Sequence, residues 1–388
     1  MGSLVANARQ LDLLRLVRAE APVTRGDLSR RTGLSASQVS RIVSELIGAG
    51  LVEVDDRAHP ATGRPSDLLR LAGDGRWVVG LEIGGGMMGA VVTNLRGEVR
   101  ARLLEPLPPV ADREEAVACF ADLAQRALAR SAARSEEVLG LGAGLYAVVD
   151  PVQGTVLDWS EHPGWDGWWR GFGLRDALRD RLGWEHVTID DAVRMRAVAE
   201  ARRPAPGVPA DFVYVLADSG IGAALVIDGR AYFGPNRLAG EIGHVAPEAS
   251  DEPCACGRRG CLEAVASSSA LEREARRTWP DPLPDAREVL AMADGGDDRA
   301  TAMVERAGDR LAAVLASAVS LVCPSLVVVG GALARSSRYL AAVDRGLAAR
   351  IHPRATAGLR VERSGLGPEA GVIGAATAAL DELFVASP

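Results

Sequence analysis

A short segment with the sequence GHVAPEASDEPCACGRRGCLE restricts the fold more than any other part of the chain. It carries four side chains of the kinds that bind zinc, namely His244, Cys254, Cys256 and Cys261. Zinc binds such a Cys₃His set tetrahedrally, and four protein ligands leave no position for water, so we expect a structural site. Gly257 and Gly260 allow the tight turn that returns Cys261 to the metal. The alternative is three buried or disulfide-bonded cysteines beside an unrelated histidine, although a Cys-x-Cys pair cannot easily bridge itself.

The length and charge of the chain bound its class. A chain of 388 residues suggests two or three domains, and a net charge of −7 argues against a protein that binds nucleic acid over its whole surface. Residues 1–72 carry ten arginines against eight acidic residues, so a nucleic-acid contact would have to be local. Cys119 and Cys323 lie among apolar neighbours, and we expect buried thiols there.

Two observations favour a cytoplasmic protein with no membrane partner. Charged residues interrupt the apolar residues at the N-terminus, which is not the pattern of a signal peptide. The uncharged run between Arg310 and Arg335 contains Pro324, so it fits a helix followed by a buried strand better than a membrane span.

The first 72 residues predict a winged helix-turn-helix. Helical patterns at 7–20, 24–33 and 35–50 precede two short strand patterns separated by the loop HPATGRPSD. The third helix is the candidate recognition helix, because its polar face suits base edges and phosphates in the major groove. An arginine held between glycine and proline in the loop suits the minor groove. The candidate DNA-binding residues are Ser35, Ser37, Gln38, Ser40, Arg41 and Arg64. The alternative is a helical module that binds protein.

The remainder of the chain alternates strands, glycines and helices, which by periodicity alone predicts an α/β protein with two lobes. The segment LAGEIGHVAPEASDEPCACGRRGCLEAVAS resembles the zinc signature of the ROK family (repressors, open reading frames and sugar kinases), and further matches run along most of the chain. The resemblance implies a two-lobed actin-like (ribonuclease-H-like) ATPase fold. We expect an N-terminal lobe at 73–186, completed by a C-terminal helix at 366–388, and a C-terminal lobe at 187–365 with the zinc site, effector binding and oligomerisation.

Three sequence motifs depart from the family's kinase pattern. The first phosphate loop, usually D-I-G-G-T, begins at Glu82 and ends in glycine, and the second, usually G-T-G-I-G, begins at Asp218. The family's catalytic aspartate falls on Ala192 in an ungapped match counted back from Glu200, and alanine cannot accept a proton. A slip of one residue would place Asp191 there instead. Because phosphoryl transfer needs positioning, metal and base together, we predict no kinase activity.

This chain retains the family's sugar-binding residues better than it retains the kinase motifs. The resemblance assigns sugar contacts to the Glu and His of E-I-G-H and to the Glu of G-C-L-E, with a Gly-Trp pair in a neighbouring loop. Asp191 and Arg194 stand near the missing base, and Arg194 could receive an acidic ligand or pair with Asp190. The candidate effector residues are therefore Glu241, His244, Glu263, Asp191, Arg194, Gly164 and Trp165.

These observations predict a transcriptional regulator of the ROK type, expected to be a repressor of carbohydrate-metabolism genes. Its partners would be a double-stranded DNA operator and a sugar or sugar-phosphate effector, and it would act as a homodimer or homotetramer. Two alternatives stay open at this point. One is a ROK sugar kinase with an accessory DNA-binding domain, and the other is a DNA-binding protein that needs no effector.

Overall fold

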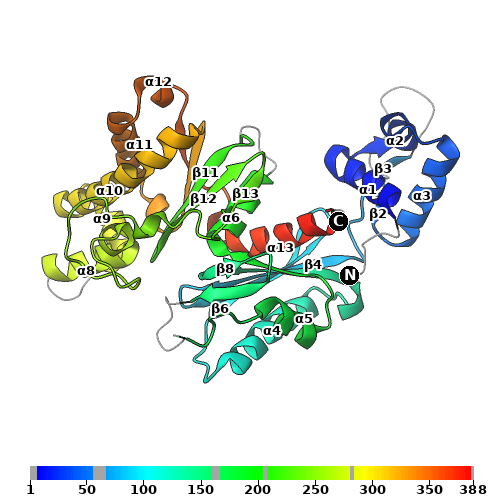
Figure 1. The fold of residues 1–388 in the computed structure, drawn as a ribbon, viewed down its shortest axis with the longest axis horizontal. Coiled ribbons are helices and arrows are strands. Elements are labelled where there is room, and N and C mark those ends of the chain that lie inside the picture. The colour runs from blue at the N-terminus through cyan, green and yellow to red at the C-terminus, as the bar shows by residue number, and fades with distance from the viewer. Residues whose placement is uncertain (1–6, 56–66, 160–166, 204–207, 280–283, 386–388) are drawn as a thin grey trace.

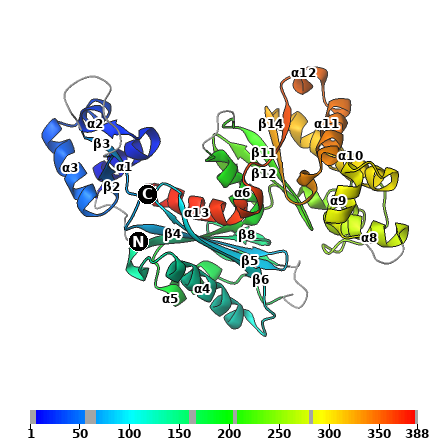
Figure 2. The ribbon, with the colours of Figure 1, turned by 180° about the vertical axis from the view of Figure 1, so that it is seen from behind.

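The computed structural model describes residues 7–55, 67–159, 167–203, 208–279 and 284–385. It contains a small N-terminal domain and two lobes, each built on a five-stranded sheet. Figure 1 shows the N-terminal domain at one end of the molecule, with the first lobe beside it and the second lobe at the far end. The last helix of the chain lies in the middle, and its C-terminus points toward the N-terminal domain (Figures 1 and 2).

The N-terminal domain is a winged helix. Three helices surround a small sheet in the order β1-β3-β2. The elements are α1 (Ala8–Glu20), β1 (Val23–Thr24), α2 (Arg25–Thr32), α3 (Ala36–Gly48), β2 (Val52–Val54) and β3 (Leu68–Leu71). Thr24 caps α2 with a reciprocal capping box, and Gly33 ends this helix at a φ of 71°. These start and stop signals explain why the sequence located the helices correctly.

The first lobe has the sheet order β10-β7-β4-β5-β6. Its strands are β4 (Trp77–Gly84), β5 (Met87–Asn94), β6 (Val99–Pro106), β7 (Val138–Leu145) and β10 (Val187–Asp191). A separate two-stranded sheet is formed by β8 (Val148–Asp150) and β9 (Thr155–Asp158). Helices α4 (Arg113–Arg130) and α5 (Leu174–Leu182) pack on this lobe, and α13 (Ala370–Leu383) packs on the sheet as well. A Cβ at Gly142 would lie 1.9 Å from the carbonyl oxygen of Ala375, so glycine lets α13 lie directly on the sheet.

The tryptophan-rich segment builds the core of this lobe. Trp159 and Trp169 are 3% and 1% exposed, and their ring centroids lie 4.9 Å apart. Phe120 of α4 stacks on Trp169 with centroids 6.2 Å apart. Trp168 is partly buried against the same cluster. These described tryptophans are therefore packing residues.

The second lobe has the sheet order β13-β12-β11-β14-β15. Its strands are β11 (Phe212–Ala217), β12 (Ile221–Ile227), β13 (Arg230–Tyr232), β14 (Leu326–Gly330) and β15 (Arg360–Arg363). Its helices are α6 (Ala192–Ala201), α7 (Leu262–Ala266), α8 (Ser268–Thr278), α9 (Ala286–Asp294), α10 (Asp298–Val322), α11 (Ser337–Arg350) and α12 (Pro353–Thr356). Short 3₁₀ turns cover Ser135–Glu137, Ile242–His244, Leu333–Arg335 and Gly367–Glu369. No helix in the described part of the chain is long and apolar enough to cross a membrane.

Two expectations need correction. The expected boundary after residue 186 would place Val187–Asp191 in the C-terminal lobe, but this strand pairs in parallel with β7 and completes the first sheet. The change of lobe therefore comes after Asp191, where α6 begins. Cys323 is not a buried thiol: it is exposed, in a left-handed conformation at the end of α10, and Cys119 is only partly buried.

Candidate functional site

The four predicted metal ligands lie together. Their ligand atoms are all within 4.8 Å of one another, and the cysteines are free of disulfides. The Nδ1 of His244 lies 3.6 Å from the Sγ of Cys254, and the Sγ atoms of Cys256 and Cys261 are also 3.6 Å apart. The loop returns as the sequence predicted, because Gly257 and Gly260 have φ values of 83° and 70°. Three thiols and an imidazole at this spacing fit a tetrahedral zinc ion.

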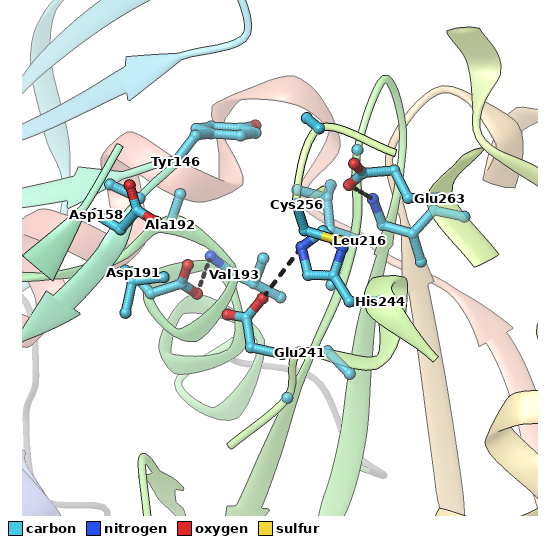
Figure 3. A pocket seen from close by; sticks show the side chains of 18 of the residues that line it. Tyr146, Asp158, Asp191, Ala192, Val193, Leu216, Glu241, His244, Cys256 and Glu263 are labelled. Carbon is cyan, nitrogen blue, oxygen red and sulfur yellow. Dashed lines mark hydrogen bonds and ion pairs between the residues drawn. The ribbon is translucent and has the colours of Figure 1, made fainter. Parts of the chain in front are cut away.

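A cavity of about 90 Å³ lies beside this cluster, between the two lobes. Tyr146 and Asp158 reach it from the first lobe, and Glu241, His244 and Glu263 reach it from the second (Figure 3). The histidine belongs to both sites: its Nδ1 faces the cysteine cluster, while its Nε2 lies 3.8 Å from a carboxylate oxygen of Glu241. His244 therefore links the cysteine cluster to one wall of the pocket.

The acidic side chains of the pocket are held in different ways. Asp191 caps α6, because its carboxylate accepts hydrogen bonds from the backbone N–H groups of Val193 (2.9 Å) and Arg194 (3.1 Å). Burial raises the pKa of Asp191 to about 7. Burial also raises the pKa of Glu241, against the opposing effects of His244 and Arg194. Glu263 accepts a hydrogen bond from the backbone N–H of Ile221 at 3.1 Å.

Arg194 does not line this pocket, although we expected it to contact the effector. Its side chain is 2% exposed, and its guanidinium lies 2.6 Å from the carboxylate of Asp190. The helical turn that begins at Asp191 directs it into the protein interior. The sequence suggested that Arg194 either receives an acidic ligand or pairs with Asp190, and in the structure it pairs with Asp190.

In the ungapped match, the family's catalytic aspartate corresponds to Ala192, which is the first residue of α6. Ala192 is fully buried and lines the pocket, and Asp191 lines it as well. Both positions considered for the family's aspartate, Ala192 and Asp191, therefore lie at the pocket. Gly164 and Trp165, which we expected beside the sugar, lie outside the described residues.

Tyr146 and Asp158 line the pocket but were not predicted from the sequence. Tyr146 follows the last residue of β7, and Asp158 ends β9. Ligands in α/β proteins commonly bind beyond the carboxyl ends of strands, and that rule would have drawn attention to both residues.

The two loops that resemble phosphate loops are occupied by the protein's own charges. Glu82 pairs with Arg196 through two hydrogen bonds of 2.8 and 2.9 Å. The Asp218 carboxylate accepts hydrogen bonds from the backbone N–H groups of Ser219 and Ala332, both at 2.9 Å. A second cavity of about 710 Å³, lined partly by Arg196, Asp218 and Gly331, lies here. A phosphate would have to displace Asp218 to use the Ala332 N–H group.

The predicted recognition helix is α3, and its N-terminus is exposed. Ser37, Ser40 and Arg41 are exposed, and Arg41 lies 3.6 Å from Glu45. Ser35 caps the helix, and the Gln38 side chain accepts a hydrogen bond from the Ser35 N–H at 3.0 Å. Gln38 therefore has a structural role that the expected contact with a base edge would interrupt. The sixth candidate, in the wing loop at position 64, lies outside the described residues.

Comparison with known proteins agrees with this architecture. The model of the MarR family matches residues 7–64, and the model of the ROK family matches residues 78–382. The N-acetylglucosamine repressor of Escherichia coli O157:H7 is 27% identical over 353 residues, which cover 87% of this chain and 83% of that repressor.

Two solved structures are also similar. A ROK family transcriptional regulator, described as a homologue of the E. coli MLC protein, aligns with 97% of this chain and 96% of its own (TM-score 0.82, 23% identity). A ROK hexokinase from Thermus thermophilus aligns over 79% of this chain and 99% of its own (TM-score 0.64, 29% identity).

A winged helix joined to a two-lobed actin-like domain defines a DNA-binding transcriptional regulator. The chain belongs to the ROK family. Its sequence is similar to a repressor of that family over both domains, whereas the kinase-like scaffold accounts for only part of its length.

Proposed function

We propose that this regulator represses carbohydrate-metabolism genes and that a small carbohydrate bound between its lobes controls its affinity for DNA. The observation that carries the proposal is the inter-lobe pocket, where residues of both lobes meet beside the metal cluster. A ligand that touches both lobes favours one relative position of the lobes over another, and this is the requirement for control by a ligand. The sugar named for the E. coli repressor supports the class of effector.

The metal cluster would hold structural zinc through His244, Cys254, Cys256 and Cys261. Its role would be to order the loop before α7 and to fix the imidazole and Glu263 at the pocket. With all four positions filled by protein, the metal would bind no substrate.

The charges around the pocket favour an unphosphorylated sugar. Among the described residues that line it, four are acidic and none is arginine or lysine. Carboxylates accept hydrogen bonds from hydroxyl groups, but they repel a phosphate. The guanidinium of Arg194, which follows the pocket residue Val193, is buried against Asp190. Between the sugar and the sugar phosphate expected from the sequence, this arrangement supports the sugar.

DNA binding would use the exposed face of α3, with Ser35, Ser37, Gln38, Ser40 and Arg41 near the major groove and Arg64 of the wing in the minor groove. A homodimer or homotetramer would bring two such helices to a palindromic operator. We propose no kinase activity, because Ala192 replaces the base and Asp218 occupies the second phosphate loop.

The test is an operator selected from random duplexes, followed by titration of monosaccharides and their 6-phosphates into the protein–DNA complex. We expect an unphosphorylated sugar to change operator affinity and its phosphate to have no effect. Selective DNA binding that no sugar changes would support the effector-independent alternative. Turnover of ATP in the presence of glucose or N-acetylglucosamine would support the kinase alternative.

A further inference from the structure

One carboxylate joins the DNA-binding domain to the helix that starts at the pocket. Asp381, near the end of α13, forms an ion pair through Oδ1 with Arg18 of α1. Its other oxygen, Oδ2, accepts hydrogen bonds from Nε and Nη2 of Arg202 at 3.1 and 3.0 Å. Arg202 is the C-cap of α6. The two arginines belong to different domains, and Asp381 is their common partner.

The DNA-binding domain rests on the same end of α13. The guanidinium of Arg18 lies 4.4 Å from the ring centroid of Phe384, and Arg15 donates a hydrogen bond of 2.7 Å to the Phe384 carbonyl. Phe384 belongs to a buried cluster that also contains Leu13 and Leu14 of α1. The DNA-binding domain therefore packs on the C-terminal end of α13, and Figure 1 shows the two side by side.

Helix α6 connects the C-terminal end of α13 to the pocket. Its N-cap, Asp191, and its first two residues, Ala192 and Val193, line the pocket. Its other end reaches Asp381 through Arg202. A helix of this length is stiff, so a displacement of its first turn also moves its last turn.

Helices α6 and α13 are in close contact near their first turns, whereas the pair of Arg202 and Asp381 joins their other ends. A Cβ at Gly374 of α13 would lie 1.8 Å from the carbonyl oxygen of Met195 in α6. The preceding strand is attached as well, because Thr188 of β10 donates a hydrogen bond of 2.5 Å to Glu382. Close-packed interiors move between discrete arrangements and do not deform continuously.

We infer that Asp381 positions the DNA-binding domain according to the state of the pocket, with α6 as the connecting element. A change at Asp191 shifts α6, Arg202 carries the shift to Asp381, and Arg18 follows in α1. This inference rests on the proposed function for its trigger, whereas the coupling between α6 and α1 is a property of this chain alone.

The first experiment needs no effector and uses the full-length protein. Amide hydrogen exchange of residues 8–20 is measured in the wild type, Asp191→Ala, Arg202→Ala and the double variant. Asp191→Ala removes the cap of α6, and we expect exchange in α1 to rise several-fold. In the Arg202→Ala background the same substitution should add nothing further. If the fold-changes in exchange caused by the two single substitutions simply multiply in the double variant, the inference is wrong.

Controls separate this coupling from general damage. Arg345→Ala removes a comparable exposed ion pair, with Glu305 (3.3 Å), in the second lobe, and should leave exchange in α1 unchanged. Circular dichroism establishes folding of each variant. If Asp191→Ala does not fold, Val193→Ala is the second way to perturb the pocket end of α6, with the same two outcomes.

The second experiment adds glucose, glucosamine, N-acetylglucosamine or xylose. For a sugar that binds by calorimetry, we expect exchange in α1 to change in the wild type and to remain constant in Arg202→Ala, with equal sugar affinity. An equal response in both proteins would contradict the role of Asp381. If none of the sugars binds, the proposed effector class is wrong, while the first experiment still decides the coupling.

Discussion

The carboxylate of Glu82 and the guanidinium of Arg196 form a bidentate ion pair beside the second cavity, with N–O distances of 2.8 and 2.9 Å. The two side chains are 12% and 9% exposed. Glu82 lies on β4 and begins the motif that resembles the first phosphate loop of the family's kinases, and Arg196 lies on α6. The pair thus joins a strand of the first lobe to a helix of the second.

This buried pair predicts a strong effect on stability. Glu82→Ala leaves the Arg196 charge unpaired and should lower the free energy of unfolding by about 3–5 kcal/mol. The double variant Glu82→Met/Arg196→Met should recover most of that loss, because apolar side chains replace both charges. Denaturant unfolding measures both, with Arg179→Ala, in an exposed pair with Asp176, as a control of small effect. A double variant no more stable than Glu82→Ala would contradict this account.

The elevated pKa of Asp191 predicts a pH dependence. The folded protein holds this proton up to a pH of about 7, whereas the unfolded chain releases it near 3.8. The contribution to stability is therefore complete below 3.8 and is lost as the pH rises through 7. Asp191→Asn keeps the helix cap and removes the titration. Relative to this variant, the wild type should lose about 4 kcal/mol of stability between pH 4 and 8 by denaturant unfolding, because a pKa difference of one unit corresponds to about 1.4 kcal/mol. Parallel pH profiles would show that the carboxyl is ionised throughout.

The cysteine cluster predicts a metal-dependent fold around the pocket. Cys261 is 1% exposed and precedes α7, so Cys261→Ser should abolish binding of one zinc per chain and lower the melting temperature. Elemental analysis and thermal unfolding measure the two effects. Cys323→Ser, at an exposed thiol away from the cluster, is the matched control. Full retention of zinc by Cys261→Ser would remove this cysteine from the ligand set.

The exposed face of α3 predicts a specific loss of DNA affinity. Arg41→Ala should weaken binding to the selected operator by about 1–3 kcal/mol if its guanidinium binds a guanine edge. In that case, binding to unrelated DNA should change much less. A uniform loss for all duplexes, with a smaller salt dependence, would instead assign Arg41 to a phosphate. Arg130→Ala, exposed at the end of α4, is the control for a lost positive charge.

Local sequence patterns predicted much of this molecule. The four candidate metal ligands lie close together in the sequence, so their spacing and two glycines suffice to bring them together. The winged helix was also predictable, since capping residues and glycine stops are local signals. Even the engagement of Gln38 in a capping box follows from its position three residues after Ser35.

Contacts between distant segments depended on the tertiary structure. Arg194 was expected at the pocket, but its orientation on α6 buries it against Asp190. Asp381 and Arg18 are 363 residues apart, and no sequence pattern connects them. The sequence thus determined which chemical groups and local elements the protein has, because those depend on neighbours along the chain. Only the packing of α6 and α13 between the lobes decided which groups meet, because that depends on side-chain directions across the whole fold.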